Sequence, residues 1–573
     1  MRRLPRRTVA LGAVVGVLVP LVVAFGASAQ WDANPLGGVV TKTEHRCGAL
    51  DRPEPGIQGD VPKAEQDANR AYGGYNCGLA LVGHATLDHD GRPPTGNANM
   101  AWAGNCAYVA GPSSAILPGT PPNPPAGAGI AVVDASDPAH PRHVLNLRQP
   151  GGLATIETIN AVTTPEGRSI LVVGQYGNDH QLSAPKPMDI YDVSNRDCSK
   201  PRFVKTFMWP TNIHNLTISG NGRYVFATQP LEVLDISPLW DADPATDVRF
   251  LGNVEDAMEG PTVAVGPSAD LDDALPAPIR EAQHSIYPSH EAWPTFDGTK
   301  LYLGGQLPTF EQFTIVDISK WLERTPSGAP VGAPRVISQQ SGRGHSVRTA
   351  TINGKRFVLH SEESPFGAGF GCIPETANPF AGPSQPWLTD ISDEAHPKLV
   401  SQFGLAINDP SNCAEQLQAN EDDSVHYHDV DDPDDTTFVM ASMWNAGLRV
   451  FDVRNPAAPT EVAYFNPADV DPSANTVLDH AWGHVRYVAE TGQIWFATAD
   501  GGFWIVEIEP QVRAQLGLDG KARARGLTPP VPSHPHGRPG AAGLGIAVPL
   551  SAVIDVTPYY CTLGAITAPA RVL

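Results

Sequence analysis

The segment at residues 130–134 has the sequence IAVVD, an apolar run that ends in an acidic residue and is followed by Ala-Ser-Asp-Pro. The pattern recurs along the chain, and its seven copies are IAVVD at 130–134, MDIYD at 188–192, LEVLD at 231–235, FTIVD at 313–317, PWLTD at 386–390, LRVFD at 448–452 and FWIVE at 503–507. The acidic residues lie 43 to 82 residues apart, a period that is typical of four-stranded propeller blades rather than helical solenoids. The sequence therefore predicts an all-β fold, a seven-bladed β-propeller.

The ends of the repeat region predict how the ring is closed. Residues 79–84 (LALVGH) have the pattern of a last blade strand without the three strands that should precede it. This strand is expected to complete the blade that begins near His484, which would leave no free sheet edge. The predicted domains are an N-terminal arm at 30–75, the propeller at 76–510, and a C-terminal extension at 511–573; both extensions are expected to be irregular.

The first 29 residues have the features of a cleaved signal peptide. Four arginines among residues 2–7 precede an apolar run over 9–25, and Ala27-Ser28-Ala29 forms a small-residue cleavage pattern before Gln30. A membrane anchor is the alternative, but Pro20 interrupts the run. Arg6-Arg7 also resembles a twin-arginine signal, so export by either the Sec or the twin-arginine route is open. We expect a secreted or extracytoplasmic protein without a membrane span in the mature chain.

Charge and cysteine content restrict the partners. The formal net charge of −22 argues against nucleic acid and anionic lipid, because both are polyanions. The seven cysteines contain no Cys-x-x-Cys pair, so in an oxidising compartment disulfides are favoured over zinc binding. The pairs Cys47 with Cys77 and Cys372 with Cys413 are plausible loop staples, and an odd cysteine remains.

Histidines recur at one position of the repeat. When the innermost strand of each blade is aligned by the strand that follows it, five blades begin with histidine and two with asparagine: His214, His290, His345, His428, His484, Asn99 and Asn160. Equivalent positions in a propeller lie at one height in its central channel, so these side chains are predicted to form a ring. Histidine occupies only 18 of 573 positions, so five histidines at seven equivalent sites are far more than this composition would place there by chance. The alternative is a wet channel in which each imidazole binds only water.

The predicted ring has the donor chemistry of a transition-metal site. Neutral imidazoles suit Cu, Fe or Zn rather than Mg or Ca, and rigid inner strands can leave one coordination position open for reaction. The five histidines are therefore predicted as metal ligands, for copper or iron ahead of zinc. Further residues are predicted to orient the ligands or line the channel: Asn99, Asn160, His426, His480, His360, Glu157 and Glu362.

Three turns after the repeated strands carry a family resemblance. DASDP at 134–138, DISD at 390–393 and DVRNP at 452–456 resemble the LVIVD-repeat family of extracytoplasmic propellers, over about residues 76 to 510. The resemblance implies a seven-bladed propeller and no particular reaction. In architecture and histidine ring the chain is also similar to carotenoid cleavage dioxygenases, which hold iron, and to selenium-binding proteins including methanethiol oxidase, which hold copper. That similarity concerns the fold only.

Two functions follow from these observations. The first is a metal-dependent oxidoreductase that acts on a small-molecule substrate at the histidine-ringed channel. The second is a non-catalytic binding or scaffold propeller that presents its loops to a cell-envelope partner. Clustering of histidines inside the channel, where a surface partner does not reach, favours the first.

Overall fold

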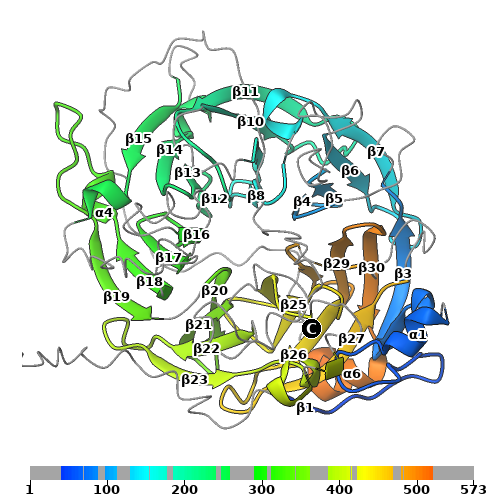
Figure 1. Cartoon of the computed structure of the whole chain (residues 1–573). Coiled ribbons are helices and arrows are strands. Elements are labelled where there is room, and N and C mark those ends of the chain that lie inside the picture. The colour runs from blue at the N-terminus through cyan, green and yellow to red at the C-terminus, as the bar shows by residue number, and fades with distance from the viewer. Residues whose placement is uncertain are drawn as a thin grey trace, which may run out of the picture. The chain divides into compact units, whose positions relative to one another are not determined.

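The strands of the chain form seven sheets arranged around one axis (Figure 1). The computed structural model describes residues 40–68, 70–87, 97–111, 129–153, 155–176, 185–240, 247–258, 289–305, 311–341, 344–361, 385–412, 414–415, 423–468, 479–481 and 483–520. The predicted signal peptide, the Cys372–Cys413 pair, Glu362 and most of the C-terminal extension lie outside these residues. The predicted all-β, seven-bladed propeller is confirmed.

Each sheet is one blade, with its innermost strand given first here. Blade 1 contains β4 (Met100–Ala103), β5 (Cys106–Val109), β6 (Ile130–Asp134) and β7 (Arg142–Leu147). Blade 2 contains β8 (Ile159–Thr163), β9 (Ser169–Gly174), β10 (Lys186–Asp192) and β11 (Arg202–Trp209). Blade 3 contains β12 (Leu216–Ile218), β13 (Tyr224–Ala227), β14 (Glu232–Asp235) and β15 (Arg249–Asn253). Blade 4 contains β16 (Ser289–Pro294), β17 (Lys300–Gly305), β18 (Glu311–Asp317) and β19 (Arg335–Ser341).

Two of the remaining three blades, blades 6 and 7, include strands from the N-terminal part of the chain. Blade 5 contains β20 (Val347–Ile352), β21 (Lys355–Ser361), β22 (Pro386–Asp390) and β23 (Lys398–Gln402). Blade 6 contains β24 (Tyr427–Val430), β25 (Phe438–Ser442), β26 (Leu448–Asp452) and β27 (Thr460–Asn466), with β1 (Lys42–Thr43) and β2 (Tyr75–Cys77) on β27. Blade 7 contains β28 (Arg486–Val488), β29 (Gln493–Thr498), β30 (Gly502–Ile508) and β3 (Leu79–Ala85).

Helices in the described residues are short and lie between strands or at the ends. The α-helices are α1 (Lys63–Asp67), α4 (Ser319–Leu322) and α6 (Pro510–Leu516). The 3-10 helices are η1 (Ala71–Gly73), η2 (Pro150–Leu153), η3 (Ser237–Trp240), η4 (Glu255–Ala257), η6 (Ala406–Asn408), η7 (Pro410–Asn412) and η8 (Leu518–Gly520). None of the described helices has the length and apolar character that a bilayer crossing needs.

The ring closes through the N-terminal strand, as the sequence predicts. Strand β3 pairs antiparallel with β30 and supplies the outermost strand of blade 7 (Figure 1). The first and last parts of the propeller are thereby joined by backbone hydrogen bonds, which removes an exposed edge on β30.

The acidic residue at the end of each repeated strand is a turn-forming group. Asp134, Asp192, Asp317 and Asp390 each accept a hydrogen bond from the backbone N–H two residues later, at 2.8 to 3.0 Å. An aspartate that binds the backbone ahead of it ends the strand in a tight turn. These four carboxylates therefore have a structural role.

Apolar packing between the blades forms the core. Seven clusters of buried hydrophobic residues each join two neighbouring blades, from the pair of blades 1 and 2 around to the pair of blades 7 and 1. The repeated strands supply many of these residues because both faces of each sheet contact another blade, which is why most of their residues are apolar and the apolar positions do not alternate. The core is a ring around the axis, and polar residues can gather at its centre.

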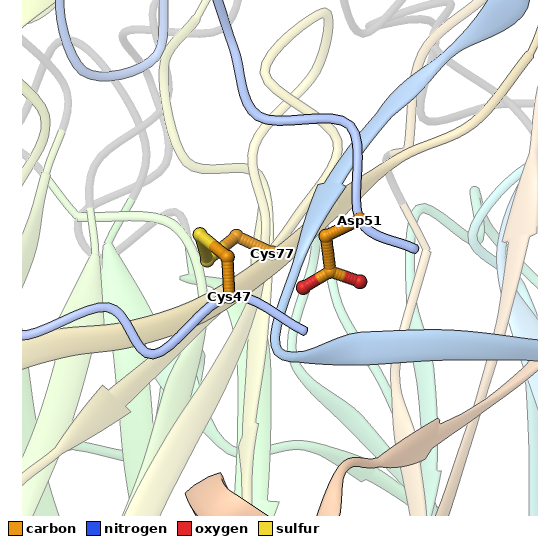
Figure 2. Close-up of side chains that lie close together, drawn as sticks. All are labelled: Cys47, Asp51 and Cys77. Atoms are coloured by element: carbon orange, nitrogen blue, oxygen red, sulfur yellow. A yellow bond between two sulfur atoms is a disulfide. The ribbon is translucent and has the colours of Figure 1, made fainter. Parts of the chain in front are cut away.

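The N-terminal arm is tied to blade 6. Strand β1 pairs parallel with β27, β2 pairs antiparallel with it, and the predicted disulfide between Cys47 and Cys77 is present. Asp51 lies beside this disulfide (Figure 2) and accepts hydrogen bonds from the backbone N–H groups of Gly48 and Gly78, each at 2.7 Å. Because both cysteines are in the disulfide, this Cys–Asp group is a structural brace and not a metal site.

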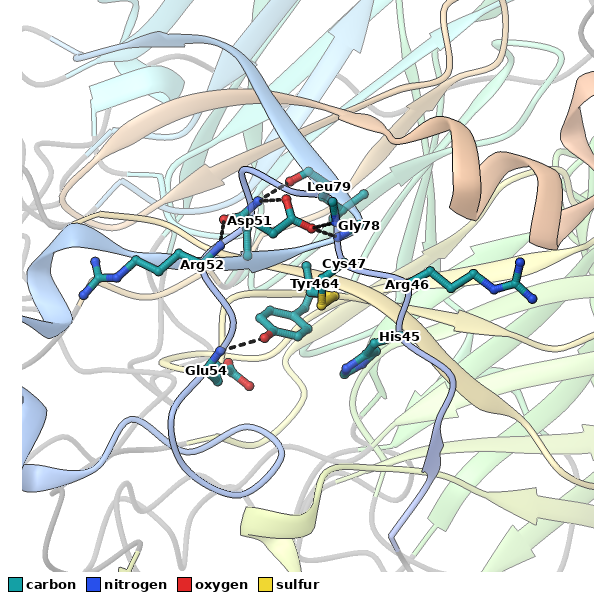
Figure 3. Close-up of a disulfide and its surroundings, with 12 residues drawn as sticks. His45, Arg46, Cys47, Asp51, Arg52, Glu54, Gly78, Leu79 and Tyr464 are labelled. Atoms are coloured by element: carbon teal, nitrogen blue, oxygen red, sulfur yellow. Dashed lines mark hydrogen bonds between the residues drawn. A yellow bond between two sulfur atoms is a disulfide. The ribbon is translucent and has the colours of Figure 1, made fainter.

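A buried ion pair fastens the same arm. Arg449 of β26 is completely buried and contacts Glu54 of the arm and Glu461 of β27. The hydroxyl of Tyr464 accepts a hydrogen bond of 2.8 Å from the Glu54 backbone N–H (Figure 3). The arm thus covers the outer edge of β27 with backbone pairing, a disulfide and a buried charge pair.

A second disulfide connects two blades. Cys106, at the start of β5 in blade 1, is bonded to Cys198, which lies between β10 and β11 of blade 2. The cysteines are 92 residues apart in sequence, and nothing local in the sequence indicates this pairing.

Removal of the first disulfide should loosen the arm. We expect the double substitution Cys47→Ser with Cys77→Ser to lower the free energy of unfolding by about 2–4 kcal/mol, because the unfolded chain loses a covalent constraint. Urea denaturation under non-reducing conditions would measure this. An unchanged midpoint would show that β1, β2 and the Arg449 pair hold the arm without help.

Candidate metal centre

Five side chains meet where the innermost strands begin. Glu157, His214 and His345 each lie two residues before a strand, namely β8, β12 and β20; His426 immediately precedes β24, and His290 is the second residue of β16. They come from blades 2 to 6 in order. All five are buried, with at most 1% of each residue exposed.

The imidazoles surround the carboxylate of Glu157. His290 Nε2 lies 3.1 Å and His214 Nε2 lies 3.5 Å from Oε2, while His426 Nε2 lies 3.3 Å from Oε1. Neighbouring rings are close, with centroid distances of 4.5 Å for His214 and His290, 3.7 Å for His290 and His345, and 4.5 Å for His345 and His426.

These residues form two groups with metal-ligand spacing. Glu157, His214 and His290 form one, and Glu157, His345 and His426 form the other. In each group the ligand atoms lie within 4.8 Å of one another.

Backbone contacts hold the imidazoles in place. His345 Nδ1 lies 2.9 Å from the carbonyl oxygen of His426, so it donates a hydrogen bond and leaves the lone pair on Nε2. A fixed tautomer of this kind is the usual arrangement for a metal-binding histidine. Thr228 donates from its hydroxyl to the His290 carbonyl at 2.7 Å. Gly304 allows the close approach of blade 4, because a Cβ there would lie 2.2 Å from the His345 carbonyl oxygen.

The pKa directions at His345 and Glu157 favour the forms that can bind a metal. Burial, and then the neighbouring imidazoles of His290 and His426, lower the pKa of His345 well below its usual range. Burial raises the pKa of Glu157, but His290 and His426 outweigh it and hold the pKa well below the usual value. Neutral imidazole and ionised carboxylate are the forms that bind metals.

Three of the five predicted ring histidines are in this cluster. The structure brings together His214, His290 and His345, and it adds His426 and Glu157, which the sequence analysis had placed in the supporting layer. His428 and His484 are not among these groups. In blade 6 the turn between β24 and β25 spans residues 431–437, so counting back from β25 selects His428 in place of His426. Counting two residues back from each inner strand's own start finds the cluster residues in blades 2, 3 and 5, and His426 lies one residue before the inner strand of blade 6.

His428 lies between blades instead. It is completely buried, both of its ring nitrogens lack a hydrogen-bond partner among the described residues, and burial, followed by Arg348, lowers its pKa to about 3. His360 in β21 is its neighbour: its Nε2 lies 3.0 Å from the Thr389 hydroxyl, and burial, followed by His428, lowers its pKa to about 3.

His484 belongs to a second, ionic layer. Its Nδ1 lies 3.2 Å from Asp429 Oδ2, and its Nε2 lies 3.3 Å from Glu291 Oε1. Burial and Arg348 lower the pKa of His484, but the two carboxylates outweigh them, so that the pKa lies above its usual value. Arg348 also contacts the ring nitrogens of His484, at 2.6 Å from Nδ1 and 2.9 Å from Nε2, so charged side chains surround this imidazole, unlike the four clustered histidines.

Arg348 is the centre of this ionic layer. Its guanidinium lies 2.8 Å from Glu291 Oε1 and 2.9 Å from Asp429 Oδ1, and it covers the Trp293 ring with Cζ 3.9 Å from the centroid. Burial raises the pKa of both carboxyls, but Arg348 and then His484 hold each pKa below its usual value. Only 4% of the Arg348 side chain is exposed.

The carboxylates of this layer also fix the inner strands. Glu291 accepts hydrogen bonds from the Val347 backbone N–H at 2.9 Å and the Ser346 hydroxyl at 3.1 Å, immediately after His345 of the cluster. Asp429 accepts a hydrogen bond of 2.9 Å from the Val485 N–H. Blades 4 and 5, and blades 6 and 7, are thus joined beside the cluster.

Tyr427 lies between the two layers. Its hydroxyl accepts a 2.8 Å hydrogen bond from the Asn215 side-chain amide, so a side chain from blade 6 reaches blade 3 across the axis. The Tyr427 ring is 5.1 Å from that of His345 on one side and 4.2 Å from that of His484 on the other.

The two predicted ring asparagines serve as braces between blades. Asn99 Oδ1 accepts a 2.8 Å hydrogen bond from the His484 backbone N–H, which joins blades 7 and 1. Asn160 Oδ1 accepts one of 3.1 Å from Ile218, which joins blades 2 and 3. His480 is partly exposed, and its ring lies 5.1 Å from that of Trp444, which itself lies 4.9 Å from that of His426. These three residues support the cluster without entering it.

Comparison with known proteins identifies the repeat. The family model of the LVIVD repeat matches residues 438–466, which span β25 to β27 of blade 6. The chain has no match among curated proteins.

Several solved structures are similar to the chain. They include the β-propeller domain of Cps50 (Swd1) from Myceliophteria thermophila, at 10% identity and a TM-score of 0.41, covering 72% of this chain and 97% of that one. They also include hydrazine synthase of Kuenenia stuttgartiensis, at 12% identity and a TM-score of 0.41, covering 72% and 96%. A third is Sqt1 of Chaetomium thermophilum, at 10% identity and a TM-score of 0.39, covering 76% and 99%. At these identities the likeness concerns the fold alone. The chain is a seven-bladed β-propeller that carries the LVIVD repeat.

Proposed function

We propose that this propeller is an exported, metal-dependent oxidoreductase that binds a transition metal at Glu157, His214, His290, His345 and His426. The observation that carries the proposal is the convergence of four imidazoles, from four successive blades, on one buried carboxylate. Burying five polar side chains together is costly unless something compensates for their lost hydration, and a bound cation does so.

The donor set determines which metals fit. Imidazole nitrogens with one carboxylate oxygen suit iron, copper or zinc, whereas calcium and magnesium prefer oxygen ligands. No thiolate takes part among the described residues, because Cys47, Cys77, Cys106 and Cys198 are all in disulfides. Copper or iron is proposed ahead of zinc because only these supply the redox chemistry of an oxidoreductase.

The residues around the cluster have defined tasks in this proposal. The hydrogen bonds that Glu291 of blade 4 accepts from blade 5 fix the start of β20 and thus the position of His345. Tyr427 and the Arg348 layer fill the axis on one side of the cluster. A small-molecule substrate would therefore approach from the face at which the inner strands begin, and the buried ligands would exclude bulk water from the reacting centre.

The cellular context agrees with this proposal. Two disulfides among the described residues fit the oxidising compartment that the N-terminal signal pattern predicts. The net charge of −22 disfavours polyanionic partners, which leaves a small molecule as the proposed substrate.

Metal analysis of the purified protein tests the proposal. After expression with iron, copper and zinc available, we expect at least one equivalent of copper or iron per chain, together with oxygen uptake in the presence of a small oxidisable substrate. Less than about 0.2 equivalents would contradict a metal centre and would favour a non-catalytic binding propeller. One equivalent of zinc without redox activity would support the metal site but contradict the proposed oxidoreductase activity.

A further inference from the structure

We infer that the centre holds two metal ions, one on His214 and His290 and the other on His345 and His426, with the Glu157 carboxylate as the bridge between them. This inference rests on the proposed function and deepens it, because it assigns the number of ions and the class of ligand between them.

The first observation is that the donors separate into two sets. Each set contains two histidines and Glu157, with its ligand atoms within 4.8 Å of one another. Among the described residues no such group combines a histidine of one pair with a histidine of the other. A single ion would require all four nitrogens within about 4.2 Å of one another, since each bond is about 2.0–2.1 Å long. The four nitrogens do not have the spacing of one coordination sphere.

The second observation is the orientation of the carboxylate. Oε2 faces His290 and His214 at 3.1 and 3.5 Å, whereas Oε1 faces His426 at 3.3 Å. Each oxygen is therefore directed at a different histidine pair. Carboxylates with this arrangement bridge two metals, and the ions of two-metal sites lie about 3.5–4 Å apart.

The third observation concerns the rings at the boundary between the pairs. His290 and His345 face each other with centroids 3.7 Å apart and planes inclined by 34°. A metal lies in the plane of the imidazole that binds it, so two rings this close together and tilted by only 34° converge less readily on one ion between them than rings whose planes cross steeply. Within the first pair, His214 and His290 are inclined by 75°, so their planes cross.

The two-ion arrangement defines what would bind between the ions. Two imidazoles and one carboxylate oxygen give each ion three protein donors, a set that leaves positions open, as in two-histidine-one-carboxylate sites. One carboxylate balances only a quarter of the charge of two dications, and burial makes the remainder costly. The open positions would therefore take a small anionic oxygen ligand that bridges both ions, such as hydroxide or an oxyanion.

Metal stoichiometry in matched variants tests this inference. Metal-free wild-type protein is loaded with Cu(II), and in parallel with Zn(II), desalted, and analysed for metal per folded chain. The variants are His214→Leu, His426→Leu, the double variant with both substitutions, and His428→Leu as a buried histidine outside the cluster. Circular dichroism confirms that each retains the strand signal of the wild type.

We expect two equivalents in the wild type and in His428→Leu, one in each single ligand variant, and none in the double variant. One equivalent in the wild type, lost in either single variant, would overturn the two-ion inference and leave the proposed metal centre intact. No metal in the wild type would overturn both. If a ligand variant does not fold, the wild-type stoichiometry of one or two still decides the question.

Discussion

Replacement of Arg348 by methionine is expected to lower the free energy of unfolding of the metal-free protein by about 3–5 kcal/mol. The substitution keeps an unbranched apolar stem but removes the guanidinium that contacts Glu291 and Asp429 in a region that is almost closed to solvent. Loss of one partner from a buried charge cluster is costly because the remaining charges keep their desolvation without their counter-ion. Urea denaturation followed by tryptophan fluorescence would measure the change.

The pH dependence of the Arg348→Met variant has a defined sign. In the wild type the pKa values of Asp429 and Glu291 lie below their usual range, so the pair contributes stability above about pH 4 and loses it as the pH falls. Without Arg348, burial should raise both pKa values, and the variant should be destabilised least at acidic pH. The difference in unfolding free energy between the wild type and the variant should therefore become smaller as the pH is lowered from 8 to 5.

An exposed ion pair is the matched control for Arg348. Arg202 lies 2.6 Å from Asp192, but 60% of its side chain is exposed. Arg202→Met should cost less than about 1 kcal/mol, since solvent screens such pairs. Equal losses in the two variants, or a deficit in Arg348→Met that does not depend on pH, would contradict the assignment of Arg348 as the charge that holds the inner strands together.

Replacing His426 or His428 by leucine should distinguish a residue of the cluster from a buried histidine beside it. His426→Leu is expected to weaken the affinity for the ion held by His345 and His426 by about 100-fold or more and to abolish oxygen uptake, because a ligand is removed. His428→Leu should leave metal affinity unchanged and cost little stability. Both ring nitrogens of His428 lack hydrogen-bond partners among the described residues. Replacement by leucine therefore removes two buried polar atoms without breaking a hydrogen bond between described residues.

Isothermal titration of metal-free protein, with circular dichroism as the check on folding, would measure this pair of variants. Loss of metal in His428→Leu with retention in His426→Leu would restore the ring that the sequence alignment predicts. Loss in both would place the ligands at the interface of blades 5 and 6 rather than at the axis.

The fold could be predicted because its determinants are local and repeated. Each copy such as IAVVD is mostly apolar because both sheet faces are buried, and an aspartate such as Asp134 ends its strand by accepting a hydrogen bond from the backbone just after it. The unpaired strand at 79–84 needs a partner, and only the incomplete last blade offers one. The Cys106–Cys198 disulfide was not predictable, because it depends on how two blades lie side by side rather than on spacing.

The candidate site was predicted in part for an equally physical reason. The repeat placed His214, His290 and His345 at equivalent heights, but a long turn in blade 6 shifted the register from His426 to His428. Glu157 was missed as a central residue because the alignment gave weight to histidine and asparagine, although it stands two residues before its strand as His214 does. The charge state of His484 depends on Asp429 and Glu291, which come from other blades, and no local pattern reveals such a contact.

X-ray diffraction from crystals of the metal-loaded protein, recorded at the copper, iron and zinc absorption edges, tests the central claim most directly. The account predicts anomalous peaks about 2.0–2.2 Å from the Nε2 atoms of the clustered histidines, on both sides of the Glu157 carboxylate. Crystals in which those imidazoles remain hydrogen-bonded to Glu157, with metal bound elsewhere or not at all, would contradict it.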